Sequence, residues 1–391
     1  MEKKRLYYID NLRVATIMSV ILIHLAVTYS GSGIWFYNEV RPLGFFNHIF
    51  FSFFQAFVQG FSMGMLFFVA GYFTPLAYDR KNTARFISDR CRRLVLPTLF
   101  FLLVVTPLMI AVVGSTALWK GSTSSFPEFY WQYIKSAGIQ LLGTGPMWFA
   151  LALFIFCLIY TLWRLLLPRP AAPDSRQGIL TTGRLLLLIV IIAIVAFLLR
   201  LFFPIGSVFW GMQLGFFSQY IIMFIVGIVA YRTNCFESMT SATGRRWLAA
   251  GLILGFIGWL ILRYFAGPYD FSTLTLKYVN TGKKVIGGLS WPAAYYAIWE
   301  SFVAVAMTMG LLALFRDKLN FSNKLTQKLS AGAFAVYMFH PSIIVAVTML
   351  MTTLDMLPVF KWALAGLISI PLCFLIAYYI LLRIPLLNKI L

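Results

Sequence analysis

The sequence has few charged residues for its length, and this scarcity decides the broad class of the protein. Only 11% of the 391 residues are charged, 61% are hydrophobic, and the mean hydropathy is +0.84. A soluble domain of this length and composition would expose far too much apolar surface to water. A single soluble domain is therefore excluded, and the lipid bilayer must supply most of the solvent.

Acidic residues are scarcer still, with 12 Asp and Glu against 32 Lys and Arg and a formal charge of +20. Such an excess can indicate a nucleic-acid-binding protein, but only where the basic side chains form a stripe on a solvated domain. Here the basic residues lie in short segments between apolar runs. We therefore expect no nucleic acid partner.

Cysteines are also few, and their spacing carries no motif. Cys157 and Cys373 lie inside apolar runs, whereas Cys91 and Cys235 lie in segments expected in the cytoplasm. No CxxC pair is present, so neither a disulfide framework nor a metal site is predicted.

What the sequence has in abundance is long apolar runs. A membrane-spanning helix needs about 20 largely apolar residues. Ten runs qualify, at about 13–30, 45–73, 94–114, 146–167, 184–203, 216–231, 247–265, 291–315, 330–352 and 362–383. The predicted fold is all-α, a polytopic integral membrane protein with about ten transmembrane helices in one bundle. We expect one membrane domain over residues 1–391 and no appended soluble domain.

The distribution of basic residues predicts the orientation of this bundle. With the N-terminus in the cytoplasm, 23 of the 32 Lys and Arg residues fall on the inner side, as the positive-inside rule requires. We therefore expect a multi-pass protein of the cell (inner) membrane with both termini cytoplasmic. The outer loop 266–290 is an exception, with Lys277, Lys283 and Lys284; a solvated loop is favoured there over a substrate lid. The stretch 126–139 is aromatic and is expected to be an interfacial helix.

Ionisable residues inside the bilayer are costly and indicate functional sites. Arg13 and His24 are eleven positions apart, which closes three helical turns with about 20° left over and a rise of roughly 16 Å. Both side chains therefore share one helix face, with Arg13 at the cytoplasmic mouth and His24 near mid-membrane. Asp10 lies three residues before Arg13 and can pair with it. For Arg13 alone a topological anchor is favoured; for His24 a chemical role is favoured over a helix-tying hydrogen bond.

Glu300 and His340 lie at the same predicted depth as His24, about 15 Å from the ends of their own helices by helical rise. Three titratable groups at one depth suggest a shared polar cavity. Pro341 follows His340, frees the carbonyl of Tyr337 and is expected to kink the helix. A buried Glu–His pair that only ties helices together is the alternative reading of Glu300 and His340.

A cluster of basic residues lies on the inner side between the second and third apolar runs: Arg80, Lys81, Arg85, Arg90, Arg92 and Arg93. The topology alone accounts for such a cluster. Beside Arg13 it also suits a polyanion such as the phosphates of coenzyme A, because guanidinium groups match phosphate oxygens.

Several segments match motifs of a known family. They are YIDNLRVATIMSVILIH at Tyr8–His24, LFFVAGYF at Leu66–Phe73, FISDRCRRLVLP at Phe86–Pro97, MWF at Met147–Phe149 and AVYMFHP at Ala335–Pro341. The chain resembles the bacterial acyltransferase-3 family of membrane O-acyltransferases over nearly its whole length. LFFVAGYF and LRIPLL at Leu382–Leu387 are more similar to members that succinylate periplasmic glucans. Ala70 replaces the family's usual Ser, so no role of that hydroxyl carries over.

The resemblance implies an acyl-CoA donor on the cytoplasmic side and a hydroxyl acceptor, usually on a glycan, reached from the other side. We expect acyl-CoA to be a co-substrate, with no cofactor and no metal. In this hypothesis His24 is the general base, and Glu300 and His340 complete the catalytic site. Asp10, Arg13, Arg90 and Arg93 would bind the donor.

Two alternatives follow from the same residues. A proton-coupled transporter or flippase of a polar lipid or glycan would use His24, Glu300 and His340 as a proton relay, but the sequence lacks the internal repeat common in transporters. A non-catalytic scaffold gives no reason for three ionisable groups at one depth. The acyl group, the acceptor, the roles of Glu300 and His340 and the oligomeric state are left open by the sequence.

Overall fold

The computed structural model describes residues 5–39, 43–115, 126–135, 144–167, 181–233, 239–276, 285–385 and 387. Within these residues ten helical segments are long and apolar enough to cross a membrane, which confirms the predicted all-α polytopic bundle. Cys235, Lys277, Lys283 and Lys284 lie outside the described residues.

Each of the ten segments overlaps one of the predicted runs, and several extend beyond it. They are α1 (Tyr7–Ser30), α2 (Phe45–Asp79), the chain of α3 (Thr83–Arg90), η1 (Cys91–Val95), α4 (Leu96–Phe100), η2 (Phe101–Val105) and α5 (Thr106–Ser115), then α7 (Trp148–Leu166) after η5 (Gly145–Met147), α8 (Thr182–Phe202), α9 (Phe217–Arg232) after η6 (Leu214–Phe216), α11 (Ser241–Ala266), α13 (Trp291–Lys318), α14 (Lys324–Leu350) and α15 (Pro358–Tyr379) with η7 (Leu381–Arg383). Two short hairpins join β1 (Val208–Phe209) to β2 (Met212–Gln213) and β3 (Tyr269–Asp270) to β4 (Thr275–Leu276).

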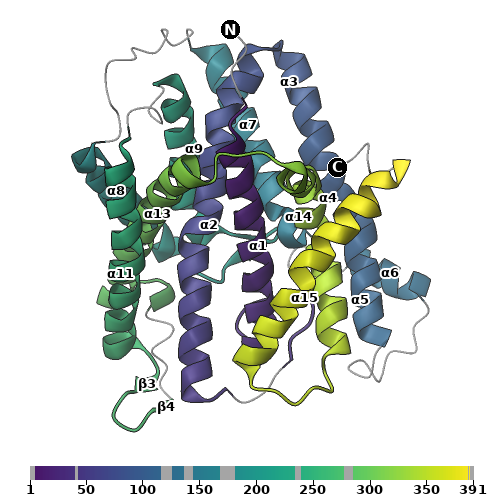
Figure 1. Ribbon diagram of the computed structural model, residues 1–391, viewed down its shortest axis with the longest axis vertical. Helices are drawn as coiled ribbons and strands as arrows, with labels where there is room; N and C mark the ends of the chain where they lie inside the picture. Colours follow the sequence, from purple (N-terminus) through teal and green to yellow (C-terminus); the bar gives the residue numbers. More distant parts are fainter. Residues whose placement is uncertain are drawn as a thin grey trace.

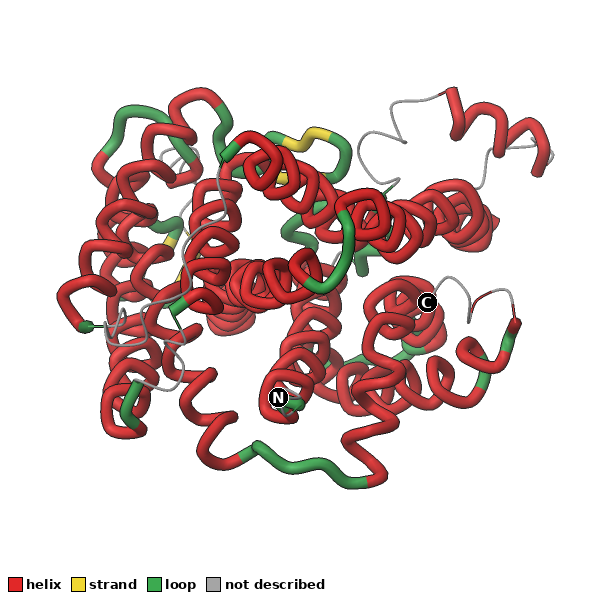
Figure 2. The backbone as a smooth tube through the Cα atoms, turned by 90° about the horizontal axis from the view of Figure 1, so that it is seen from above, coloured by secondary structure: helices red, strands yellow, loops and turns green. Residues whose placement is uncertain are grey.

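Helix α1 lies near the middle of the bundle, where it packs against α2, α13, α14 and α15 (Figure 1). The chain starts at one end of the long axis, here called the N side, and the β3–β4 hairpin lies at the other, the far side (Figure 1). Seen from above, α6 (Phe126–Lys135) lies apart from the main group of helices (Figure 2). A helix is therefore present where the interfacial helix was predicted.

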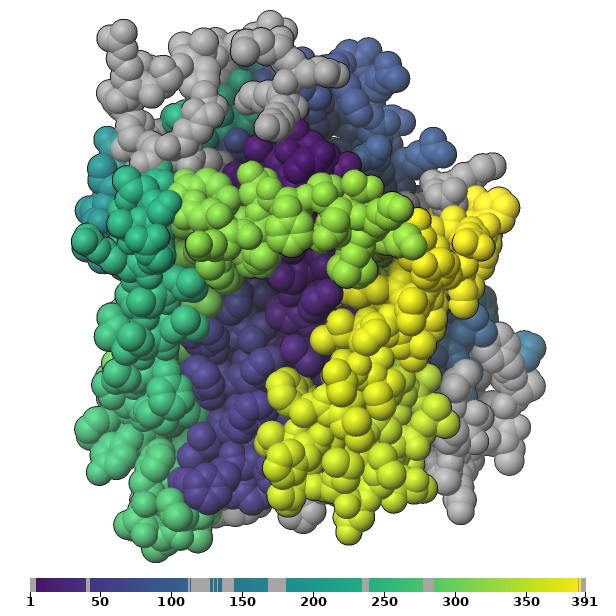
Figure 3. Space-filling view, viewed as in Figure 1, coloured from purple at the N-terminus to yellow at the C-terminus, as the bar shows by residue number. Residues whose placement is uncertain are grey.

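The outer surface of the bundle is apolar, as a lipid-facing surface must be. Long aliphatic side chains on the flanking helices are exposed, among them Leu187 and Ile194 on α8, Ile253 on α11 and Leu367 on α15. In the space-filling view α1 is set back between α2 and α15 (Figure 3). An apolar groove lies there, lined by Leu22 of α1 and by Trp362, Gly366 and Pro371 of α15.

Helices α2 and α9 approach one another closely because glycines face the opposing backbone. A Cβ atom on Gly71 would collide with the carbonyl oxygen of Phe224, and one on Gly227 with that of Phe68. Small residues at such crossings are typical of membrane helix pairs, where packing and hydrogen bonds rather than hydrophobicity drive association.

The basic cluster between the second and third apolar runs lies largely on helical segments. Asn82 caps α3 by accepting a hydrogen bond from the Arg85 backbone N–H at 2.8 Å, so the helix begins after Arg80 and Lys81. It carries Arg85 and Arg90, and η1 carries Arg92 and Arg93. Two wide π-helical turns, η1 and η2, then interrupt the segment on either side of Pro97. Proline lacks the N–H that a regular helix needs, and wide turns of this kind often occur at functional sites.

The far-side hairpin is anchored to the bundle rather than free in solvent. The Tyr269 hydroxyl is 2.8 Å from Nδ1 of His48 and 2.7 Å from Oγ of Ser52, both on α2. Burial raises the pKa of the Tyr269 hydroxyl, which therefore keeps its proton to donate. The described part of the predicted outer loop is thus fixed at its start.

Candidate active site

Two of the chain's three histidines meet inside the bundle. Nδ1 of His24 on α1 lies 2.9 Å from Nε2 of His340 on α14, and the two rings are stacked with centroids 5.0 Å apart. His340 is completely buried, whereas His24 is partly accessible. The structure therefore brings together two of the three titratable residues that the sequence placed at one depth.

Pro341 explains how α14 orients the His340 ring. Because proline has no N–H, the Tyr337 carbonyl loses its regular helical partner. That carbonyl instead lies 2.9 Å from Nδ1 of His340, and the Val336 carbonyl lies 3.2 Å away. The Tyr337 hydroxyl donates to the carbonyl of Pro146, which fixes this turn of α14 against η5.

These contacts define the tautomers of both rings. A carbonyl oxygen only accepts hydrogen bonds, so Nδ1 of His340 carries the proton and Nε2 is the acceptor in the neutral ring. His24 must then donate from Nδ1 to His340. The consequence is that Nε2 of His24 is the unprotonated nitrogen, which is the form that a general base needs.

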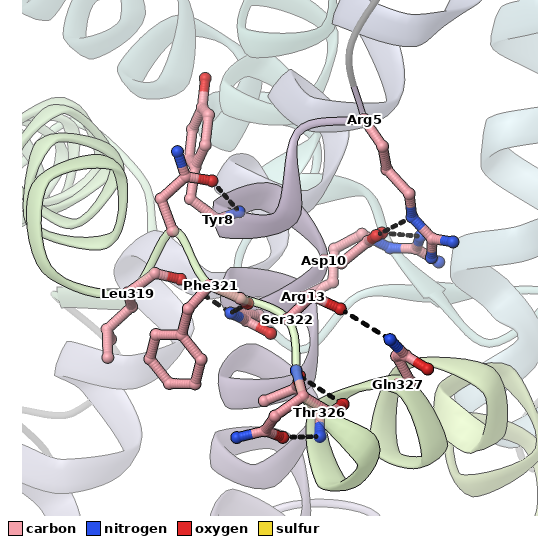
Figure 4. A network of polar contacts seen from close by, with 12 residues as sticks. Arg5, Tyr8, Asp10, Arg13, Leu319, Phe321, Ser322, Thr326 and Gln327 are labelled. Carbon is pink, nitrogen blue, oxygen red and sulfur yellow. Dashed lines mark hydrogen bonds and ion pairs between the residues drawn. The ribbon is translucent and has the colours of Figure 1, made fainter.

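The N-side ends of α1 and α14 are held in register by polar contacts (Figure 4). The Asn11 side chain donates to the carbonyls of Leu319 at 2.7 Å and Phe321 at 3.0 Å, in the connection between α13 and α14. Asn323 and Thr326 then cap α14 reciprocally. This fixed start sets the height of His340 relative to His24.

The segment 31–39 folds back from the far side onto the histidine pair. Gly31 (φ +64°) and Gly33 (φ +121°) permit the reversal, and the Glu39 N–H donates to the Thr28 carbonyl at 2.9 Å. Trp35 stacks on His24 with ring centroids 4.1 Å apart and planes 9° from parallel. The indole therefore covers one face of the candidate base.

A buried ion pair holds this segment in place. Nζ of Lys361, at the start of α15, lies 2.7 Å from Oε1 of Glu39, and the two side chains are 1% and 10% exposed. Lys361 also donates to the Leu354 carbonyl at 3.1 Å. A charge buried to this degree requires such partners.

Glu300 lies in a different polar cluster. Its carboxylate pairs with the guanidinium of Arg200 on α8, and both side chains are almost fully buried. Nε of Arg200 also donates to the Gly215 carbonyl at 2.9 Å, and its guanidinium lies over the rings of Phe216 and Tyr296. The partner that the structure gives Glu300 is thus an arginine, rather than an imidazole.

The predicted donor-binding residues lie at the N side. Asp10 is 2.8 Å from Arg5 but 3.8 Å from Arg13, and the Arg13 side chain is 46% exposed, so most of its donors are free to bind another group. Arg93 is exposed, and Arg90 lies over the Phe86 ring at 5.0 Å. By contrast, Arg164 and Arg232 are both neutralised by Asp79.

Comparison with known proteins gives the family of the chain. The family model described as acyltransferase domain (Acyl_transf_3) matches residues 6–378. The chain belongs to this acyltransferase family. No curated protein and no solved structure matches it. The chain is therefore a membrane acyltransferase, an enzyme that transfers acyl groups other than aminoacyl groups.

Three side chains in or near the candidate site are not singled out by the sequence: Trp35, Arg200 and Lys361. Trp35 has no charge, and its position depends on how segment 31–39 folds. Arg200 and Lys361 were counted as outer-side topology charges, although an arginine within an apolar run is itself a signal of a buried partner. Among the described residues, no three His, Cys, Asp or Glu side chains gather as a metal site would need.

Proposed function

We propose that this acyltransferase moves an acetyl or succinyl group from cytoplasmic acyl-CoA to a hydroxyl of an envelope or extracellular glycan, with His24 as the general base. The observation that carries the proposal is the contact of Nδ1 of His24 with Nε2 of His340, whose own Nδ1 faces the Tyr337 carbonyl, because this arrangement leaves Nε2 of His24 unprotonated. A partly accessible imidazole in this tautomer can accept a proton from a hydroxyl held beside it.

The chemistry is a direct transfer. Nε2 of His24 takes the proton of the acceptor hydroxyl while the oxygen forms a bond to the thioester carbon. The tetrahedral intermediate collapses, the C–S bond breaks, and the leaving thiolate recovers the proton from His24. The products are the O-acyl ester and free coenzyme A, and the enzyme returns to its starting state.

The separation of Arg13 and His24 supports two-sided access. The eleven helical steps between them rise roughly 16 Å along α1, so phosphates bound at the N side leave room for the donor's thioester arm to reach the imidazole. Arg13 and Arg93 are exposed enough to bind those phosphates, with Arg90 beside them. We place the acceptor on the far side, where segment 31–39 reaches His24.

Mass spectrometry of envelope glycans tests the proposal. Glycans from cells that express the chain should carry an added acetyl or succinyl ester, and glycans from cells that lack the gene should not. Cells expressing the His24→Ala variant at the same level serve as the control. Identical glycan spectra from all three strains would contradict the proposed substrate class.

A further inference from the structure

The indole N–H of Trp35 is buried, and packing alone does not explain this. Its Nε1 is shielded from solvent and has no hydrogen-bond acceptor among the described residues. Buried tryptophan N–H groups usually find a hydrogen-bond partner, because leaving one unpaired is destabilising. Such an unpaired group in a native structure calls for an explanation, and a catalytic role is one of those that apply.

The position of Trp35 beside the candidate base suits a substrate group as its hydrogen-bond partner. Its ring is nearly parallel to His24 at 4.1 Å and is also stacked toward His340 at 6.4 Å. Groups at the edges of two stacked rings lie about one stacking distance apart when they are on the same side. An indole N–H on the same side of the stack as Nε2 of His24 would reach the carbonyl oxygen of a thioester attacked there.

The surroundings restrain the indole in this position. Phe36 packs edge-on against Trp35, and Tyr37 is buried against Met109 and Val345. The buried pair of Glu39 and Lys361 fixes the end of the segment. A donor restrained before the substrate binds is what stabilisation of a developing charge requires.

We propose that Trp35 is a further catalytic residue, whose indole N–H donates a hydrogen bond to the thioester carbonyl oxygen and to the oxyanion formed from it. When the acceptor oxygen bonds to the carbonyl carbon, the C=O electron pair moves onto oxygen and is held by this donor. When the C–S bond breaks, the pair re-forms the carbonyl. The inference rests on the proposed acyl transfer and adds the group that stabilises its intermediate.

The test replaces the N–H while keeping the ring. Trp35→Phe retains an aromatic surface on His24, and β-(3-benzothienyl)alanine at position 35 retains the shape of tryptophan with sulfur in place of N–H. Removal of one oxyanion donor typically lowers kcat by about 10² to 10³. We expect a fall of at least about tenfold in kcat for both variants, with the Kd for acetyl-CoA or succinyl-CoA unchanged in purified protein.

Trp362→Phe is the matched control. The Trp362 indole on α15 donates to the carbonyl of Leu22 on α1, the helix that carries His24, so this variant reports the loss of a structural N–H contact. It should lower thermal stability but change kcat by less than about threefold. A kcat for the position-35 variants within about tenfold of wild type overturns the assignment, as does a change confined to the KM for the acceptor or to the donor Kd. If the wild-type protein shows no acyl transfer at all, the proposed function fails instead.

Discussion

At the scale of single residues, the contact between His24 and His340 does more than join two helices. The Tyr337 carbonyl, freed by Pro341, directs the proton of His340 to Nδ1, and His340 in turn directs that of His24. A ring on α14 thereby determines which nitrogen of a ring on α1 is available to a substrate. His340 is a positioning residue in this account, since it acts through His24.

The role of His340 can be separated from packing by two substitutions. His340→Leu removes the acceptor for Nδ1 of His24 and permits the unproductive tautomer, so we expect kcat to fall by about 10- to 1,000-fold. His340→Gln can accept from His24 and donate to the Tyr337 carbonyl, and it should recover at least about tenfold of that loss. Steady-state kinetics at equal thermal stability check this. Equal kcat values for the Leu and Gln variants would contradict tautomer control.

Arg13 and Arg93 are expected to bind the donor. Arg13→Ala and Arg93→Ala should each raise the KM for acyl-CoA more than that for the acceptor, because a hydrogen bond to a charged group is worth about 1.5 to 3 kcal/mol. Lys318→Ala removes another exposed N-side charge at the end of α13 and is the control. Titration of acyl-CoA into purified protein measures the effect. Unchanged donor affinity in both arginine variants would place the donor elsewhere.

At the scale of helices, hydropathy predicts the existence of the spanning elements well, because each needs about 20 apolar residues in a row. It predicts their ends less well. Helix α2 continues to Asp79 through Pro75, and α3 begins at Thr83, eleven residues before the predicted run. A helix extends beyond its apolar part where Asn82 caps it and where its arginine side chains make contacts. Hydropathy detects neither the cap nor these contacts.

The sequence predicts the ionisable residues of the candidate site but not how they pair. His24, His340 and Glu300 are rare ionisable groups in apolar runs, so their cost inside a membrane singles them out. That Glu300 pairs with Arg200 and His24 with His340 depends on how α1, α8, α13 and α14 pack. The fold of segment 31–39 likewise depends on tertiary contacts, since its sequence has no periodic pattern.

The buried pair of Lys361 and Glu39 is expected to stabilise the connection between α15 and this segment. Lys361→Met removes the cation from this buried pair, and breaking such a pair typically costs about 3 to 5 kcal/mol. The double variant Lys361→Met/Glu39→Gln removes both charges and should therefore recover about half or more of the lost free energy of unfolding. Unfolding in detergent measures the free energies. Lys328→Met is the control, because it removes an exposed lysine that contacts Tyr379. Equal losses of unfolding free energy in Lys361→Met and Lys328→Met would argue against a buried pair.

At the scale of the whole molecule, the chain has two different ends. Helix α3 with its basic residues lies at the N side (Figure 1), where Arg13 and Arg93 are exposed. The far side carries the β3–β4 hairpin and segment 31–39, which reaches inward to His24. This asymmetry suits an enzyme that binds an anionic donor at one membrane surface and a second substrate at the other.

Reporter fusions test the orientation that this scheme requires. Fusions after residues 82, 240 and 320 should report the cytoplasm, and a fusion after residue 275 should report the outside, because the positive-inside rule follows the overall bias of Lys and Arg. Paired phosphatase and fluorescent reporters give opposite signals on the two sides. A cytoplasmic signal at residue 275 would reverse the assignment of the far side.

Transfer across a sealed bilayer tests the central claim most directly. Purified protein is placed in vesicles with radiolabelled acyl-CoA on the N side only and the hydroxyl acceptor on the other side only. Wild-type protein should label the acceptor, and His24→Gln, which keeps a hydrogen-bonding side chain but accepts no proton, should lower turnover by about 10² to 10⁴ while still binding acyl-CoA. Turnover by the Gln variant near the wild-type rate, or labelling only when both substrates share one side, would contradict the account.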